Sequence, residues 1–141
     1  MFRYAPRLAI AIILVLAVIA TRMTRQVKVQ DARREIARAQ ARDSMHILIR
    51  SFIDEQVDRS ECLLRIRVLL DGSHSRWQHE VPMPAFVTVS DLILSQPYGE
   101  ARAQLDGELR TAQDALRRQA LQIHEQQLIQ ELTQLKEWLD A

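Results

Sequence analysis

The feature that most constrains this chain is an uninterrupted apolar run near its N-terminus, Leu8–Ala20, which reads LAIAIILVLAVIA. A helix that is apolar on every side needs burial all round, and a chain of 141 residues has little interior in which to bury it. Charged residues bracket the run on both sides, and they are Arg3, Arg7, Arg22, Arg25 and Lys28. The sequence therefore predicts a helix that lies in a membrane.

The apolar run is short for a membrane span when it is counted alone. Thirteen residues reach about 20 Å as a helix, whereas the hydrocarbon core of a bilayer is about 30 Å thick. Counting from Tyr4 to Met23 gives twenty residues, which suffices if the side chains of Arg7 and Arg22 extend toward the headgroups. We therefore assign residues 1–23 to a transmembrane anchor.

A cleaved signal peptide is the alternative interpretation of the same segment. A basic start and an apolar stretch are followed by Val18-Ile19-Ala20, which has the form of a cleavage site. Residues 21–40 then contain six Lys and Arg, and a basic flank of this kind resists export and favours the cytoplasmic side. We predict an uncleaved, single-pass anchor in the inner cell membrane, with the N-terminus outside and the body in the cytoplasm.

Charge is divided sharply along the chain. Residues 1–42 contain nine Lys and Arg and two acidic residues, a net charge of +7, whereas residues 43–141 contain ten and sixteen, a net charge of −6. The basic part can lie against anionic lipid, while the acidic body is repelled by nucleic acid. The arginines also lack the interleaved aromatic residues of a nucleic-acid surface. We expect membrane lipid as a partner of the N-terminal helix, and no nucleic acid.

Helix is the default conformation of the first half of the chain, because residues 7–71 contain neither glycine nor proline. Residues 24–43 are almost all polar and predict a basic juxtamembrane helical stalk. The helical body, residues 44–141, begins with an amphipathic helix. Its apolar residues recur at steps of three and four, and they are Met45, Leu48, Ile49, Phe52, Ile53 and Val57.

The next part of the body contains a break, a second helix and a loop. Asp58 and Glu61 have the spacing of a capping pair and predict the break. Gly72 predicts the end of the second helix as a left-handed cap, and residues 72–84 form the only substantial loop. A third helix follows around Phe86, or alternatively a strand that begins at Val87.

The C-terminal part of the body predicts a long helix. Gln96-Pro97-Tyr98-Gly99 turns the chain, and helix continues from Glu100 to the end. Two apolar stripes follow this helix: the first contains Leu105, Leu109, Ala112 and Leu116, and the second contains Leu121, Leu128, Leu132, Leu135 and Leu139. The second stripe forms either a coiled coil or a face that folds back on the body. The fold class is all-α: a transmembrane helix, a basic stalk and a small bundle closed by a long C-terminal helix.

No catalytic, cofactor-binding or metal-binding site is predicted. His74 and His79 lie in the loop near Glu80, with no helical register to hold a metal ion. His124 begins half of a zinc-protease signature, but Leu128 stands where the second histidine would be. The three glycines are too scattered for a phosphate-binding loop, and no serine-nucleophile motif is present. We therefore expect no enzymatic activity and see no small-molecule substrate.

Three single side chains allow two interpretations each. Cys62 cannot form an internal disulfide, and it is either a small buried hydrophobe or a reactive thiol. Trp77 is either a lid folded onto the helical core or an exposed loop residue. Trp138 either caps the packed face of the last helix or anchors a partner.

Several segments resemble a family of uncharacterised bacterial membrane proteins with a single span, known as a domain of unknown function. The resemblance rests on the anchor with its basic arm, the helix around Ile49 and Phe52, and the segment LLRIRVLLD at residues 63–71. Phe86 and the helix at His124-Glu125 fit the same outline. The resemblance implies this architecture and carries no activity.

These observations favour a membrane-anchored interaction or scaffolding protein, whose partner is another protein or a second copy of the chain. The alternative is an exported or membrane-attached metal-dependent regulator or enzyme that uses His74, His79 and Glu80, with His124 as a further ligand.

Overall fold

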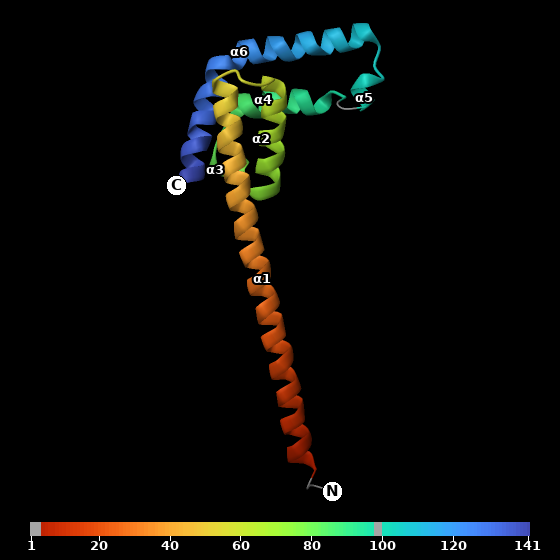
Figure 1. The fold of residues 1–141 in the computed structure, drawn as a ribbon, viewed down its shortest axis with the longest axis vertical. Helices are drawn as coiled ribbons and strands as arrows, with labels where there is room; N and C mark the ends of the chain where they lie inside the picture. Colours follow the sequence, from red (N-terminus) through yellow and green to blue (C-terminus); the bar gives the residue numbers. More distant parts are fainter. Residues whose placement is uncertain (1–3, 98–99) are drawn as a thin grey trace. The chain divides into compact units, whose positions relative to one another are not determined.

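The computed structural model describes residues 4–97 and 100–141, and every regular element in those two ranges is a helix (Figure 1). The helices are α1 (Ala5–Ile53), α2 (Arg59–Ser73), α3 (Trp77–Glu80), α4 (Pro84–Ser95), α5 (Glu100–Ala103) and α6 (Gly107–Asp140). The predicted all-α class, with long N-terminal and C-terminal helices, is confirmed. Arg3 as a flanking charge and Tyr98-Gly99 as part of the turn lie outside the described residues.

The chain divides into two compact units, residues 1–39 and residues 40–141. In the described part of the first unit, α1 is uninterrupted and its side chains are exposed from residue 5 to residue 38. Its hydroxyl groups are satisfied locally, since Thr21 and Thr24 donate to backbone carbonyls one turn earlier at 3.0 and 2.7 Å. A helix that satisfies its own polar groups is compatible with an apolar surrounding.

The second unit is a helical body with one hydrophobic core. The end of α1, together with α2, α3, α4 and α6, contributes side chains to it. The fully buried members include Met45, Ile49, Phe52, Leu63, Ile66, Leu70, Trp77, Phe86, Leu128, Leu132 and Leu135. The predicted apolar face of the first body helix is therefore confirmed at Met45, Ile49 and Phe52, whereas Ile53 and Val57 are exposed.

The break between α1 and α2 lies where the sequence predicts it. Glu55 adopts a left-handed backbone conformation with φ of 56°, which ends α1. Asp58 then caps α2, and its carboxylate accepts a hydrogen bond from the backbone N–H of Ser60 at 3.0 Å. Glu61 does not complete the capping pair; instead its carboxylate accepts a hydrogen bond from Arg65 one turn later.

Three local expectations in the middle of the body are wrong: the end of α2 at Gly72, the length of the following loop and the alternative of a strand. α2 continues through Gly72 to Ser73, because the N–H of His74 still bonds to the carbonyl of Leu70 at 2.8 Å. No left-handed glycine is needed where the helical hydrogen bonds continue. The predicted loop over residues 72–84 is correspondingly shorter and contains α3. The alternative of a strand at Val87 is also wrong, since that residue lies in α4.

Trp77 folds onto the core, as the lid interpretation predicts. Its indole N–H donates to the carboxylate of Asp71 at 2.8 Å, and its ring meets Phe86 edge-on with centroids 5.6 Å apart. The guanidinium of Arg67 lies 5.3 Å from the centre of the Trp77 ring and donates to the Ser90 hydroxyl of α4. The buried indole N–H thus has an acceptor, and these contacts hold α2, α3 and α4 together.

A buried carboxylate joins α6 to the first turn of α4. Glu131 accepts hydrogen bonds from the backbone N–H groups of Ala85 at 2.9 Å and Phe86 at 2.7 Å. Both groups belong to the first turn of α4, where no residue within the helix can accept from them. Pro84 begins that helix and has no N–H to satisfy. A side chain 45 and 46 residues away therefore caps α4 and fixes its position against α6.

The C-terminal stripe folds back on the body. Leu128, Leu132, Leu135 and Leu139 are all buried in the common core, so the second of the two alternatives for this stripe is the one observed. The first stripe differs, because Leu109 and Leu116 are about half exposed. Figure 1 shows that α6 changes direction between these two halves.

Candidate protein-docking groove

An open apolar groove lies between the last turns of α1 and the outer face of α2. Its volume is about 520 Å³, and we call it the α1/α2 groove. Its lining residues are Ser44, Ile47, Leu48, Leu64, Arg65, Val68 and Leu69. All of them belong to the second unit of the chain.

The groove exists because both helices carry apolar side chains on two sides. On α1, Ile49 faces the core while Ile47 is 67% exposed. On α2, Ile66 is buried while Val68 is 60% exposed. Contact with water is unfavourable for such neighbouring aliphatic side chains. Covering them with another apolar surface would therefore be favourable.

A smaller hollow of about 270 Å³ adjoins the groove and shares Ile47, Leu48 and Arg65 with it. Val57 and the buried Cys62 contribute to its lining. Burial raises the pKa of the Cys62 thiol, and the negative charges of nearby acidic side chains raise it further. The thiol is therefore protonated at neutral pH, so Cys62 has the properties of a small hydrophobe rather than of a nucleophile.

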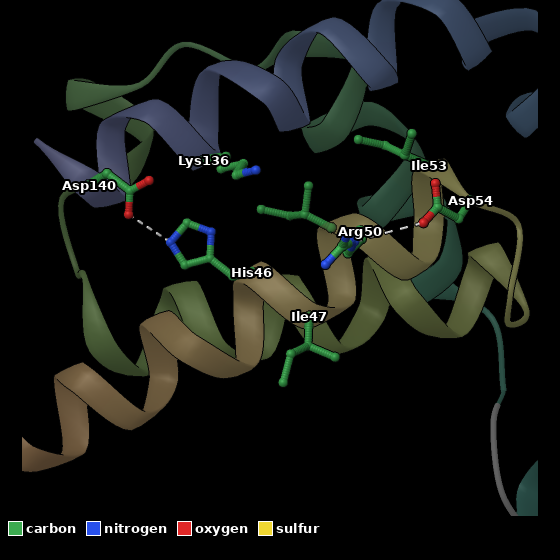
Figure 2. Close-up of a pocket in the computed structure, with 8 residues that line it drawn as sticks. His46, Ile47, Arg50, Ile53, Asp54, Lys136 and Asp140 are labelled. Atoms are coloured by element: carbon green, nitrogen blue, oxygen red, sulfur yellow. Dashed lines mark hydrogen bonds and ion pairs between the residues drawn. The ribbon is translucent and has the colours of Figure 1, made fainter.

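A third pocket, of about 450 Å³, also has Ile47 in its lining (Figure 2). Its two ends carry charged pairs: Nε2 of His46 lies 2.8 Å from a carboxylate oxygen of Asp140, and Nε of Arg50 lies 4.0 Å from one of Asp54. Ile47 contributes to all three hollows, which makes it the central apolar side chain of this surface. The contact between His46 and Asp140 could not be predicted from the sequence, because the two residues are 94 positions apart.

One stretch of α1 is long and apolar enough to cross a membrane, and none of it is buried within the protein. A signal sequence near an N-terminus has the same length and composition. The described structure thus contains an N-terminal helix of the predicted kind. The orientation of this helix across a membrane, and the identity of that membrane, stay predictions.

Comparison with protein families gives a match over most of the chain. The family described as "Protein of unknown function (DUF2489)" matches residues 11–135. The chain belongs to this family. Comparisons with curated proteins and with solved structures found no match. Membership in DUF2489 confirms the resemblance to a family of unknown function, while a bacterial origin and a single span stay predictions.

The histidines of this DUF2489 chain do not gather. His74 is half-buried, lies 2.7 Å from the hydroxyl of Ser73 and meets the Trp138 ring edge-on at 5.1 Å. His79 is exposed on α3, and His124 is half-buried on α6. Within residues 4–97 and 100–141, no three His, Cys, Asp or Glu side chains are grouped so that they could hold a metal ion. Trp138 lies against His74, which fits its interpretation as a cap on the packed helix.

The groove contains no motif of reactive residues that would mark it in the sequence. A signal was nevertheless present. Ile47, Leu64 and Val68 interrupt the polar sides of two amphipathic helices that already have complete core faces. Apolar residues beyond those needed for the core are the sequence mark of a docking surface.

Proposed function

We propose that this chain is a membrane-tethered interaction protein whose helical body binds another protein through the α1/α2 groove. The observation that carries the proposal is the groove itself, about 520 Å³ of open apolar space with Ile47 and Val68 exposed at its centre. An amphipathic helix of a partner fits this shape, because apolar side chains one turn apart can enter a groove between two helices.

Polar side chains lie at the edge of the groove, and they leave it open. Arg65 pairs with Glu61 along α2, and both side chains are more than half exposed. A polar rim around an apolar centre is the usual composition of a protein interface. Arg65 and Glu61 are free to turn toward charges of the partner, because an exposed pair of this kind holds its geometry only weakly.

The same proposal places the body on the cytoplasmic face of the inner membrane, held by residues 5–23 of α1. The apolar run and the excess of Lys and Arg directly after it support this orientation. The test is the intact mass of native protein recovered from washed membranes. A full-length mass in the membrane fraction supports the anchor, and molecules that begin at Thr21 contradict it.

The docking proposal is tested by photocrosslinking of the full chain in cells. A photoreactive residue replaces Val68 in the groove or, as a matched control, Ile123, which is 68% exposed on α6 and lines none of the three hollows. We expect one discrete crosslinked protein from position 68 and none from position 123. The substitution Ile47→Arg should remove the crosslink, since it places a charge in the apolar centre.

Two outcomes would contradict the docking proposal: equal crosslinking from both positions, or no crosslinked protein from position 68. A product of twice the mass of the chain identifies the partner as a second copy. Any other single mass identifies a different protein.

A further inference from the structure

A separate pocket of about 410 Å³ lies among α5, α6 and the start of α2, and we call it the arginine pocket. Its lining residues are Asp58, Ser60, Arg102, Asp114, Arg117, Arg118 and Leu121. Three guanidinium groups and two carboxylates give it a net charge of +1. This local excess of positive charge is unusual in a body whose net charge is −6 over residues 43–141.

The guanidinium groups of the pocket have spare hydrogen-bonding capacity. Arg102 donates to Asp114 at 2.6 Å, and Arg117 donates from Nε to the side-chain oxygen of Gln96. Within the described ranges neither Arg117 nor Arg118 has a carboxylate within 4.0 Å. The Nε of Arg102 and one Nη of Arg117 are buried without an acceptor in that same part of the chain. Unpaired charged donors of this kind call for an acceptor.

Ser60 provides a second, independent sign of a ligand. The residue is only 7% exposed and lines the pocket. Its backbone N–H bonds to Asp58, but its hydroxyl has no hydrogen-bond partner in residues 4–97 or 100–141. Ser60 also stands in the first turn of the 15-residue helix α2, where the helix dipole favours a negative charge.

The three arginines of the pocket all lower the pKa of one carboxyl group, that of Asp114. The hydrogen bond from Arg102 holds the pKa of the Asp114 carboxyl below its usual value. Burial opposes this effect, and the charges of Arg102, Arg117 and Arg118 each lower the pKa further. Once Asp58 and Asp114 are ionised, a second anion in the pocket is attracted by the remaining net charge of +1.

We propose that the arginine pocket binds the phosphate group of a small, soluble phosphate ester. Guanidinium groups match phosphate oxygens with paired hydrogen bonds, and the free hydroxyl of Ser60 can donate one more. The pocket is larger than a bare phosphate and falls in the size range of small-molecule sites. Leu121 supplies an apolar wall for the carbon part of the ester. This site is independent of the α1/α2 groove, since the two share no lining residue.

The test uses the full chain in detergent, titrated at constant ionic strength with inorganic phosphate and with glycerol phosphate. The readout is the amide NMR signal of Ser60. We expect saturable shifts with both probes and tighter binding of the ester. Arg118→Gln and Arg117→Gln should each weaken binding by about tenfold, since each removes a charged donor. Arg118 is exposed, so its replacement leaves the fold intact.

Two further variants control for electrostatics and for unspecific binding. Asp58→Asn keeps the helix cap but removes a negative charge from the pocket, and it should tighten binding by about threefold. Arg110→Gln removes an exposed arginine of α6 outside the pocket and should leave binding unchanged.

The proposal is overturned if phosphate shifts no signal at Ser60, or if Arg118→Gln and Arg110→Gln bind equally well. Vesicles that contain phosphatidylglycerol distinguish the source of the phosphate. Binding to these vesicles, without any shift by the soluble probes, would overturn the proposal in favour of a lipid headgroup.

Discussion

The two halves of α6 have similar leucine patterns but differ in how deeply their leucines are buried. In the C-terminal half, Leu128, Leu132 and Leu135 are fully buried, because α4 packs along this part of the body. In the N-terminal half, Leu109 and Leu116 remain about half exposed. The comparison shows that periodicity defines a face of a helix, whereas burial depends on whether another element is available to cover that face.

The same two halves differ in how they use a carboxylate. Glu131 in the C-terminal half is buried and caps α4 through two backbone N–H groups. Asp114 in the N-terminal half is partly exposed and pairs with Arg102 of α5. One carboxylate thus satisfies groups that water cannot reach, while the other makes a contact that water and salt can replace.

The largest expected difference between the halves concerns leucine packing. Leu132→Ala should lower the free energy of unfolding by about 3 kcal/mol, because it leaves a cavity in the core. Leu116→Ala should change it by about 0.5 kcal/mol or less, because the side chain is half exposed. Urea unfolding of the full chain in detergent, followed by the fluorescence of Trp77 and Trp138, measures both values.

Equal losses in the two leucine variants would contradict the comparison. They would mean that a second surface covers the N-terminal half of α6 in the folded protein. A loss confined to Leu132→Ala would confirm that the core ends before that half.

The sequence predicted those features that depend on local pattern. The helices, the core leucines of α6 and the cap at Asp58 follow from periodicity and from residue types that are close together in the chain. Glu131 could not be found in this way, because the N–H groups that it caps are 45 and 46 residues away. The groove could be predicted only in part: the additional apolar residues are visible in the sequence, but which of Ile47 and Ile49 is exposed depends on where α2 lies.

The second expected effect concerns the buried cap of α4. Glu131→Ala should cost about 2 kcal/mol, because two buried N–H groups lose their acceptor. Glu131→Gln should cost less, since its carbonyl oxygen can still accept from one of them. Glu137→Gln is the matched control on the exposed side of the same helix, and it should have no measurable effect. The same urea unfolding experiment compares the three variants.

If Glu131→Gln proved as stable as the unmodified chain, the charge of the carboxylate would have no role in the cap. Amide exchange at Ala85 and Phe86 then reports whether the two hydrogen bonds persist. Loss of protection at these two amides alone would identify the cap as the element that was weakened.

The smallest expected effect belongs to Asp114, and its sign follows from the direction of the pKa shift. The pKa of this carboxyl is lower in the folded chain than its usual value, chiefly because Arg102 donates a hydrogen bond to it. The ionised group therefore contributes stability above the unfolded pKa, and this contribution is lost as the pH falls through the folded pKa. Asp114→Asn should cost about 0.5 kcal/mol at pH 7 and nothing in acid, once the pH has fallen through the lowered pKa and the carboxyl is protonated. Urea unfolding of both chains at pH 7 and in acid measures the difference. The cost of Asp114→Asn at pH 7 should also be smaller in about 1 M salt, because salt screens the partly exposed carboxylate. The cost of Glu131→Ala should not change, because salt does not reach the buried carboxylate.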